Sequence, residues 1–374
     1  MAASTKKPWL VIAGGGTGGH LYPGLAVAEA VRKIQPDFDV TVFGTTRPID
    51  QQLTESRGFE LVAQEVRAFP RQPFAWPGFL MAWRRSVKVA RARFMERPPA
   101  VVLGLGGYAS GPPIVAAAKL GIPTALFNPD AVPGRANRTL AAKVDRVFVQ
   151  WEVTGDHFPK AKSVVCTGCP IRSGFTTAKL FDGQRALKLN EEKKTLLITG
   201  ASQGAASINA AALELCELWK VADTWQIVHL TGTKDFEMCR DRYKDSGIDA
   251  RVLSYTEHMP LCMVAADLII SRAGASTLAE ITAMGKPSVL MPYPFDRKRH
   301  QEANARVLAD QQAAELVLDS NNPKDNAKRL RDVLRDLMKS DERRRRLSRA
   351  AAALGRSDAA QTIAGELFEM AQRG

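Results

Sequence analysis

The sequence contains only five cysteines in 374 residues, and their spacing is irregular. An odd number of cysteines without a regular pattern does not build a disulfide framework, so we expect a reducing compartment. Cys166 and Cys169 form a C-x-x-C pair, but the chain has none of the other features of a small thiol oxidoreductase. A zinc site would need two further ligands, and His258 and Cys262 lie far away along the chain. We therefore expect neither a bound metal nor a cofactor.

Long apolar runs are also absent. Only residues 9–13 separate Lys7 from the first glycines, which is too short for the apolar core of a signal peptide, roughly 7 to 15 residues long. The longest uncharged stretch of the first half, residues 98–118, contains four prolines and four glycines and cannot cross a bilayer as one helix. We expect a protein that is soluble or bound to a membrane only at its surface.

Acidic residues are fewer than basic ones. Lysine and arginine number 52 and aspartate and glutamate 39, which gives a formal net charge of +13. This excess predicts an anionic partner, which could be a nucleic acid, an acidic membrane surface or a phosphorylated small molecule. The length suggests two domains at roughly 150 residues each, and the 45% apolar residues are typical of globular proteins.

Short β-branched runs alternate with longer amphipathic segments, which is typical of parallel strands joined by crossover helices. In the first half we predict strands at residues 9–13, 39–44, 59–63, 100–104, 123–127 and 145–149. In the second half we predict strands at residues 195–199, 225–230, 250–254, 267–271, 287–291 and 314–318. Each series has about the size of one doubly wound parallel sheet.

Two further segments complete this organisation. Residues 172–194 have no strong periodicity and many polar side chains, so we predict a domain linker there. Residues 323–373 are predicted to form two or three basic helices, with Arg343–Arg346 on a solvated face. A nucleic-acid surface is the alternative for this basic run, but no nucleic-acid-binding module accompanies it. We therefore expect no nucleic-acid partner.

A glycine-rich turn follows the first predicted strand. Residues 14–20 read GGGTGGH and precede a helix that we expect to begin near Tyr22. Glycines let the backbone approach a phosphate, and the helix offers unpaired amides to an anion. Gly14, Gly16 and Gly19 match the dinucleotide pattern G-x-G-x-x-G. That pattern also needs an acid at the end of the second strand, and residues 43–46 contain none.

Two more turns of this kind follow other predicted strands. Residues 200–205 open the second half in the same way as the first. Residues 104–111 form a third glycine-rich turn, for which a tight packing turn is the alternative interpretation. Open parallel sheets bind ligands at the carboxyl ends of their strands, so two such domains predict ligands in a crevice between them.

Six strings occur in an order and spacing that resemble the MurG family of N-acetylglucosamine transferases: GGGTGGHLYPGLAVAE, GLGGYASGP, TGCPIR, ITGASQGAASIN, SRAGASTLAE and RHQEANA. Members of this family convert lipid I to lipid II in peptidoglycan synthesis. The resemblance spans almost the whole chain. It implies an α/β chain with the GT-B fold, in which two Rossmann-like, doubly wound parallel-sheet domains face a central cleft.

The resemblance also implies what each domain does. Residues 1–172 would take the acceptor and face the membrane, and residues 173–355 would bind the UDP-sugar. A C-terminal helix over about residues 356–374 would pack back on the first domain. The reaction would be a metal-free, inverting transfer of N-acetylglucosamine from its UDP donor to the 4-hydroxyl of a polyprenyl-diphosphate-linked muramyl-pentapeptide, at the cytoplasmic face of the inner membrane.

Such a transfer needs a base for the acceptor hydroxyl and a site for the departing anion. His20 suits the base, because a neutral imidazole accepts a proton near neutral pH. Alternatively, His20 binds the acceptor diphosphate or caps its turn. Asp130 is a second candidate for catalysis and for holding a sugar hydroxyl. The residues expected at the acceptor diphosphate are Gly15, Gly16, Gly19, His20, Gly107, Tyr108 and Ser110.

The donor site is expected mainly in the second half. Backbone amides and the hydroxyl of the second turn would hold the donor diphosphate without a metal. Glu280 would accept hydrogen bonds from both ribose hydroxyls, and the amides of Gln301 and Asn304 would contact the sugar. Arg172 would end the TGCPIR strand at the hinge between the domains and meet the nucleotide or its phosphates. Loop 254–259 would hold the uracil. The full set expected for the donor is Thr17, Gly18, Asp130, Arg172, Ser202, Gln203, Gly204, Tyr255, Ala275, Ser276, Thr277, Glu280, Gln301 and Asn304.

Residues 127–130 depart from the family pattern. The family has His-Glu-Gln-Asn at this place, and the chain has Phe-Asn-Pro-Asp. Cys169 also stands where the family has asparagine. Two alternatives to the lipid II reaction therefore stay open. One is a related transferase with another donor sugar or glycolipid acceptor, and the other is a UDP-sugar-binding protein without activity.

Residues 67–97 combine basic and aromatic side chains. They contain eight basic residues, a single acid at Glu96, and six aromatic residues. Aromatic groups beside arginines and lysines are typical of a segment that lies on an anionic lipid surface. A buried crossover helix would explain the aromatic residues but not the basic run from Arg84 to Arg93. We expect this segment to contact the membrane surface.

Overall fold

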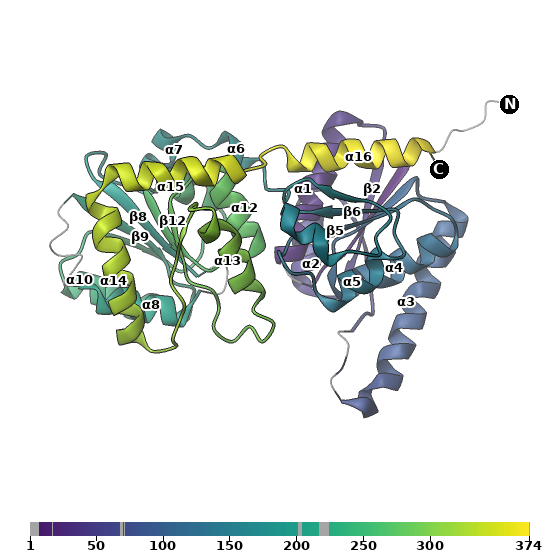
Figure 1. The fold of residues 1–374 in the computed structure, drawn as a ribbon. Coiled ribbons are helices and arrows are strands. Elements are labelled where there is room, and N and C mark those ends of the chain that lie inside the picture. Colours follow the sequence, from purple (N-terminus) through teal and green to yellow (C-terminus); the bar gives the residue numbers. More distant parts are fainter. Residues whose placement is uncertain are drawn as a thin grey trace. The chain divides into compact units, whose positions relative to one another are not determined.

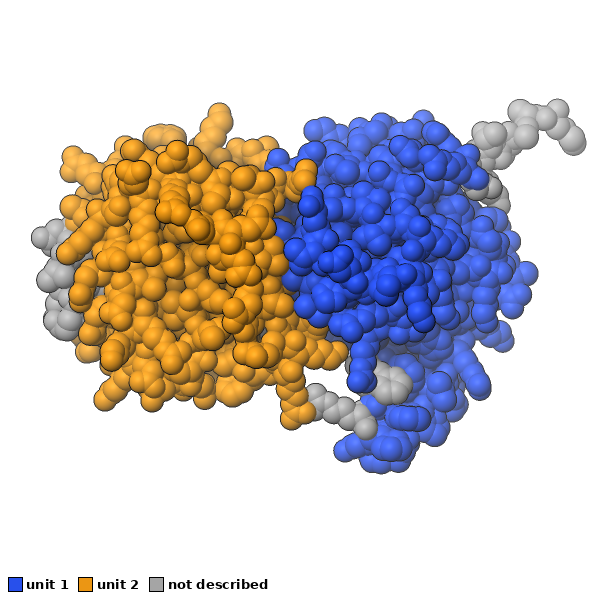
Figure 2. Space-filling model, viewed as in Figure 1, with its two compact units in different colours: residues 1–172, 357–374 blue, residues 173–356 orange. Residues whose placement is uncertain are grey.

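The computed structural model of the chain describes residues 7–16, 18–67, 70, 72–200, 204–216 and 224–373. Contacts between residues divide the chain into two compact units, which Figure 2 shows in different colours. Unit 1 consists of the described residues up to Arg172 together with those from Ser357, and unit 2 extends from Ser173 to Arg356. Each unit is built on a parallel sheet that helices cover (Figure 1).

The sheet of unit 1 is doubly wound. Its described strands are all parallel and have the order β3-β2-β1-β4-β5-β6-β7. Because β1 and β4 are parallel neighbours, the segments that follow them lie side by side at the carboxyl ends of the strands. Doubly wound folds bind ligands at this end of the sheet, where the strand order reverses. The bounds are β1 Trp9–Ala13, β2 Asp39–Thr45, β3 Glu60–Gln64, β4 Val101–Gly104, β5 Thr124–Asn128, β6 Arg146–Val149 and β7 Val164–Cys166.

The first helix of unit 1 starts earlier than its sequence suggested. Helix α1 begins at Gly18, not near Tyr22, so His20 belongs to its first turn. The other helices of unit 1 are α2 Pro48–Glu55, α3 Trp76–Glu96, α4 Gly107–Lys119, α5 Arg135–Ala141 and α16 Ala359–Arg373, with α1 ending at Ile34 and short 3-10 helices at Pro73–Ala75 and Glu152–His157.

Unit 2 repeats this architecture. Its described strands are parallel and have the order β10-β9-β8-β11-β12-β13. Their bounds are β8 Lys194–Thr199, β9 Trp225–Leu230, β10 Ala250–Leu253, β11 Leu268–Ser271, β12 Ser288–Leu290 and β13 Glu315–Leu316. The helices are α6 Gly174–Thr177, α7 Leu180–Ala186, α8 Ala206–Glu214, α10 Phe236–Asp245, α11 Met259–Ala265, α12 Ala275–Ala283, α13 His300–Asp310, α14 Pro323–Lys339 and α15 Asp341–Leu354.

Each unit has its own apolar core. In unit 1, the ring of Phe94 on α3 packs against Trp9 and Phe43 of the sheet, with centroids 6.0 and 5.5 Å away. In unit 2, Leu334 and Leu337 of α14 belong to the core beneath the sheet. Burying each such side chain contributes about 1.5–3 kcal/mol. The packing of these cores holds the strands in place, and with them the loops that follow the carboxyl ends of the strands.

The last helix returns to the first unit. Helix α16 lies along α1 (Figure 1), and the rings of Phe38 and Phe368 are 5.3 Å apart between centroids. Arg146 on β6 forms an ion pair with Glu366 on the same helix. These contacts join the two ends of the chain in one unit.

Three expectations about local structure were wrong. Residues 174–186 are not an irregular linker, because they form α6 and α7, and α7 packs closely on α11. The TGCPIR segment does not form a strand. Strand β7 ends just before it at Cys166, and Gly168 has a φ of +80°, which interrupts extended backbone.

Nor is the arginine run of α15 entirely solvated. Arg344 is buried, and its guanidinium lies 5.0 Å from the ring centroid of Trp225. It also donates to the carbonyl of Met338 and pairs with Asp341. The long arginine stem can cover apolar surface while its head finds acceptors, so the run contributes packing as well as charge.

Candidate active site

In unit 1, the turn after β1 is held by a carboxylate from α2. The backbone N–H of Gly16 donates to both carboxylate oxygens of Asp50 at 2.9 Å. The amide and hydroxyl of Thr45, at the end of β2, each donate to Oδ2 of the same group at 2.7 Å. Asp50 has no exposed surface. The Gly16 carbonyl in turn accepts a hydrogen bond from Arg47 at 2.6 Å.

His20 lies next to this turn in the first helical turn of α1. Its Nε2 atom is 3.9 Å from the place that a Cβ would take on Gly107, so the imidazole faces the start of α4. Burial lowers the pKa of His20, and the negative charges of Asp130 and Asp50 only partly oppose this effect. The imidazole is therefore neutral near pH 7 and able to accept a proton.

The third glycine-rich turn lies against the first. The hydroxyl of Tyr108 is 2.8 Å from the place that a Cβ would take on Gly16. Gly107 has a φ of +72° at the start of α4, and the buried Ser110 hydroxyl donates to its carbonyl at 3.1 Å. The described residues expected at the acceptor diphosphate therefore come from two neighbouring turns, after β1 and after β4.

The segment after β5 is held by side-chain amides. Asn128 is the last residue of β5, and its Nδ2 donates to the carbonyl of Asp130 at 2.6 Å. The Oδ1 atom of Asn128 accepts from Asn137 at 2.8 Å. Phe127 and Asn128 are both buried. Of the four residues that depart from the family pattern, two therefore belong to the sheet and two follow it.

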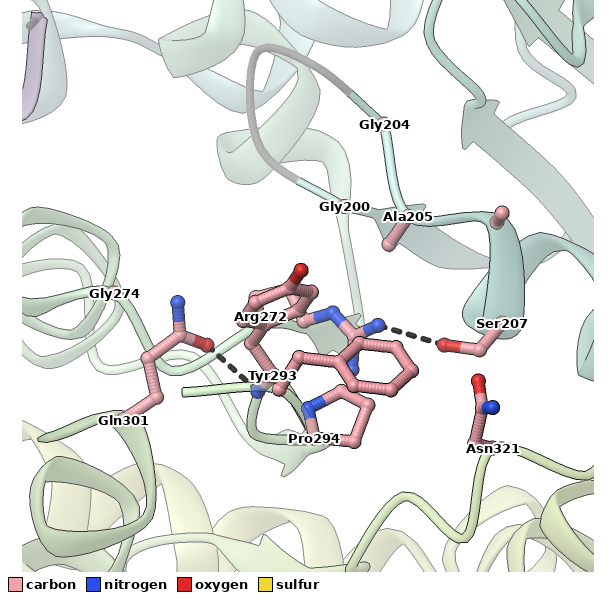
Figure 3. A pocket seen from close by; sticks show the side chains of 12 residues that line it. Gly200, Gly204, Ala205, Ser207, Arg272, Gly274, Tyr293, Pro294, Gln301 and Asn321 are labelled. Atoms are coloured by element: carbon pink, nitrogen blue, oxygen red, sulfur yellow. Dashed lines mark hydrogen bonds between the residues drawn. The ribbon is translucent and has the colours of Figure 1, made fainter. Parts of the chain in front are cut away.

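In unit 2, a cavity of about 380 Å³ opens at the carboxyl ends of the strands. Figure 3 shows both described ends of the second glycine turn above it, Gly200 and Gly204, with Arg272 and Tyr293 in the middle. Gly204 has a φ of +74°, and a Cβ at this position would lie 2.1 Å from the carbonyl oxygen of Thr231. Only glycine therefore fits at position 204. The lining residues are Gly200, Gly204, Ala205, Ala206, Ser207, Arg272, Gly274, Tyr293, Pro294, Phe295, Gln301 and Asn321.

A buried ion pair forms one wall of this cavity. Arg272 donates to Asp319 at 2.8 Å and to the Ser207 hydroxyl at 2.7 Å, and that hydroxyl donates to Asp319 at 2.5 Å. Burial opposes ionisation of Asp319, but hydrogen bonds from Ser207, Arg272, the Asn321 amide and Asn326 outweigh it and lower the pKa of Asp319. The pair thus joins α8, the end of β11 and the loop after β13.

Two aromatic side chains form another wall. The rings of Tyr293 and Phe295 are 5.6 Å apart between centroids and remain about half exposed. Gln301, on the first turn of α13, accepts a hydrogen bond from the Tyr293 amide at 3.0 Å (Figure 3). Its Nε2 group remains on the cavity side of this contact, where a sugar hydroxyl can accept from it.

The other residues expected at the donor are placed differently. Ala275, Ser276, Thr277 and the partly buried Glu280 lie on α12, which begins directly after the lining residue Gly274. Asn304 is fully buried and donates to the Ala273 carbonyl at 3.3 Å, so it supports the loop before α12. Tyr255 is exposed and is not among the lining residues. Thr17, Ser202 and Gln203 lie outside the described residues.

Gly18, Gly19 and Arg172 belong to unit 1. The two glycines open α1, and Gly19 is exposed. The guanidinium of Arg172, the last residue of this unit before α6, lies 4.9 Å from the ring centroid of Tyr22 on α1. Arg172 thus contacts helix α1, which also carries His20.

Sequence reasoning missed Asp50, Arg272, Tyr293 and Phe295. Arg272 stood inside a motif that we quoted, but a single arginine does not reveal its buried partner 47 residues away. The aromatic pair was visible as Tyr-Pro-Phe after a predicted strand. Asp50 was overlooked because the acid was sought at the end of β2 and not on the following helix.

Among the described residues, no three histidine, cysteine, aspartate or glutamate side chains gather in a way that could hold a metal ion. None of the described helices combines the length and apolarity needed to cross a bilayer.

Two doubly wound domains with glycine turns at their strand ends are the architecture of the GT-B fold. Among solved structures, MurG of Acinetobacter baumannii is 26% identical, with a TM-score of 0.74 over 97% of this chain and 99% of that chain. The UDP-GlcNAc 2-epimerase of Neisseria meningitidis, solved with bound UDP-GlcNAc, has a TM-score of 0.70 at 15% identity over 98% of this chain and 100% of that chain, which shows a common fold alone.

The sequence models of the glycosyltransferase family 28 N-terminal and C-terminal domains match residues 10–149 and 195–363. The chain belongs to glycosyltransferase family 28. Two relatives carry the name UDP-N-acetylglucosamine–N-acetylmuramyl-(pentapeptide) pyrophosphoryl-undecaprenol N-acetylglucosamine transferase. That of Halalkalibacterium halodurans is 37% identical over 95% of this chain and 97% of the relative. That of Bacillus subtilis is 34% identical over 96% of this chain and 99% of the relative.

Proposed function

We propose that this chain transfers N-acetylglucosamine from UDP-N-acetylglucosamine to the muramyl-pentapeptide of lipid I and so forms lipid II. The observation that carries the proposal is the similarity to transferases of this name over nearly the whole length of both chains. The chemistry of the two units supports it. Unit 1 offers a neutral imidazole, and unit 2 offers a cavity of the size that a nucleotide sugar needs.

The donor binds in the cavity of unit 2. The N-terminal amides of α8 and the positive end of its dipole face the second glycine turn, which suits a diphosphate. Glu280 accepts hydrogen bonds from the ribose hydroxyls, and Gln301 donates to the sugar. Arg272 is already neutralised by Asp319, so its main part is to hold the cavity wall together.

His20 is the general base. The 4-hydroxyl oxygen of the acceptor attacks the anomeric carbon, the bond from that carbon to the UDP oxygen breaks, and the hydroxyl proton moves to the imidazole. The negative charges of Asp50 and Asp130 stabilise the imidazolium that results. One displacement of this kind inverts the anomeric configuration.

The acceptor diphosphate binds at the starts of α1 and α4. The Gly16 amide is already engaged by Asp50, so the diphosphate contacts are made by Gly19, Gly107 and Tyr108. Both helices are long enough to present a substantial positive dipole end. Ser110 is buried, and its hydroxyl holds the Gly107 carbonyl by a hydrogen bond.

The changed segment 127–130 does not favour another donor. Phe127 and Asn128 are buried parts of β5, and only Pro129 and Asp130 extend beyond the strand. A transferase with another sugar or acceptor would require different side chains in contact with the substrates. Two of the four changed residues are buried in the sheet and do not provide such contacts.

Helix α3 attaches the protein to the inner leaflet of the membrane. Its first turns extend away from the rest of unit 1 (Figure 1). Met81 on these turns is 55% exposed, and Phe74, in the 3-10 helix directly before α3, is 80% exposed. Only a narrow stripe of the helix is buried, comprising Ala82, Ser86, Ala90 and Phe94. Apolar side chains at one end and exposed arginines along the helix suit an anionic bilayer surface.

The transfer is tested with labelled N-acetylglucosamine in its UDP donor and a short-chain lipid I analogue. We expect labelled lipid II analogue from the wild type, and a strong loss of turnover in His20→Ala and Glu280→Ala. Demonstrable UDP-sugar binding without turnover would contradict the proposal and favour another acceptor or an inactive binding protein, which a donor and acceptor screen would separate.

Membrane attachment is tested by co-sedimentation with vesicles of anionic or neutral lipids. The double variant Phe74→Ser, Met81→Ser should bind anionic vesicles several-fold more weakly than the wild type. Met238→Ser is the matched control, because this equally exposed apolar residue lies on α10 of unit 2. Equal binding of both variants would contradict the assignment of α3.

A further inference from the structure

Asp50 is a buried charge that the transfer chemistry does not use directly. Its carboxylate lies on α2 and is completely enclosed. Both oxygens accept from the Gly16 amide, and Oδ2 also accepts from the amide and hydroxyl of Thr45. A buried charge without good partners would strongly destabilise a fold. Here the partners are backbone and side-chain donors of two neighbouring strand ends, so the charge fastens the turn after β1 to the end of β2.

The carboxylate lies directly against the glycine-rich turn. A Cβ on Gly15 would lie 2.1 Å from Oδ2 of Asp50, and one on Gly44 would lie 3.2 Å from the same atom. The Gly16 amide points to this carboxylate and not to an outside anion. The turn therefore carries an anion that belongs to the protein, which gives its G-x-G-x-x-G sequence a role other than contact with a dinucleotide phosphate.

The fixed turn leads directly into the helix that carries His20. Gly16 is two residues before Gly18, where α1 begins, and His20 follows in the first turn. The charged and titratable groups around the turn come from several elements: Asp50 and the preceding Arg47 at α2, Asp130 after β5 and Tyr108 on α4. Of these, Asp50 contacts the turn on its amide side and Arg47 on its carbonyl side.

We propose that Asp50 is the positioning residue of the general base: as an internal anion on the Gly16 amide, it fixes the turn that presents His20 and closes this turn to nucleotides. The proposal rests on the base role of His20. Supporting groups of this kind change activity by about 10–100-fold when they are removed, because small displacements of a catalytic group weaken the reaction.

The test is Asp50→Asn, which keeps the size of the side chain but turns one acceptor into a donor facing the Gly16 amide. We expect kcat for transfer to the lipid I analogue to fall about 10–100-fold, with the KM for UDP-N-acetylglucosamine within two-fold. The acidic limb of the kcat/KM profile should move to lower pH, because the charge of Asp50 raises the pKa of His20. This shift reports the charge of Asp50 near His20, whereas the fall in kcat at an unchanged KM reports the position of His20.

The matched control is Glu60→Gln. It removes the same charge from unit 1, but Glu60 is exposed at the beginning of β3, at the opposite end of the sheet from the turn. Its rates and pH profile should equal those of the wild type. Thr45→Val is a second variant, since it removes one hydrogen bond to Asp50 and keeps the charge. It should lower kcat several-fold without moving the acidic limb, and it keeps the proposal testable if Asp50→Asn does not fold.

Three results would overturn the inference. Wild-type kcat and an unmoved acidic limb in Asp50→Asn, with His20→Ala inactive, would show that the base needs no support from Asp50 while leaving the proposed function intact. Full activity of His20→Ala would instead refute the base role itself. Wild-type kcat in Thr45→Val, measured on a folded protein, would likewise contradict the positioning role.

Discussion

The first glycine turns of the two units have similar sequences but different surroundings. In unit 1 the turn is covered by the protein's own carboxylate, and a histidine lies beside it. In unit 2 the described ends of the turn face a cavity that an aromatic pair and a neutralised arginine enclose. Under the proposed function, the same strand-turn-helix motif serves one unit for proton transfer and the other for ligand binding. The side chains that fill the space above the turn decide between these uses.

The largest effect should come from His20. His20→Ala should lower kcat/KM by about 10²–10⁴-fold, because it removes the proposed general base. The Kd for UDP-N-acetylglucosamine, measured by calorimetry, should stay within two-fold, since the proposed donor cavity is part of unit 2. An equal loss of donor binding would show that the functions are not divided between the units in this way.

The ion pair of the unit 2 cavity is the next target. Arg272→Met leaves Asp319 as an unpaired buried charge and should lower the free energy of unfolding by about 3–5 kcal/mol. Urea unfolding measures this change. Arg251→Met is the control, because its pair with Asp249 is partly exposed and should contribute no more than about 1 kcal/mol. Similar losses in the two variants would contradict the special position of Arg272.

His20 of unit 1 and His229 of unit 2 should differ in how strongly they make the free energy of unfolding depend on pH. Burial lowers the pKa of His229 to about 3, and its ring bonds to Tyr243 and Asn209 at 3.0 Å. Below the unfolded value near 6.5 the unfolded chain takes up a proton that the native state does not. His229 therefore removes about 1.4 kcal/mol of stability per pH unit as the pH falls from 6.5 toward 3.

Urea unfolding of His229→Gln and the wild type between pH 6.5 and 4.5 measures this contribution. The variant should have a slope smaller by about 1.4 kcal/mol per pH unit. Equal slopes would mean that other groups cause the acid sensitivity. His20→Ala should reduce the slope less, since Asp130 and Asp50 partly oppose the lowering of its pKa.

The smallest effect on stability should come from Gly19. Nothing lies within 4 Å of the place that a Cβ would take, and the residue is in the first turn of α1. Gly19→Ala should leave the free energy of unfolding unchanged or raise it by up to about 1 kcal/mol. A several-fold higher KM for the lipid I analogue would then report contact with the acceptor. Unchanged kinetics would remove Gly19 from the acceptor site.

The strands could be predicted well because buried parallel strands are continuous apolar runs between helices. The predicted ranges agree with β1–β6 and β8–β13 to within a few residues. The missing strand, β7, is only three residues long and lies at the sheet edge. Residues 172–194 were misjudged since α6 and α7 are short, and their packing on α11 does not leave a long periodic pattern.

The sequence alone determined the two α/β halves, the glycine turns at their strand ends and the position of His20 beside one of them, because these depend on local periodicity and on backbone freedom at glycine. Only the tertiary structure decided which charges meet. Asp50 reaches Gly16 across 34 residues, and Arg272 reaches Asp319 across 47. Such pairs depend on how the strands are ordered in the sheet. That order is set by packing of the whole unit, and no local stretch of sequence contains it.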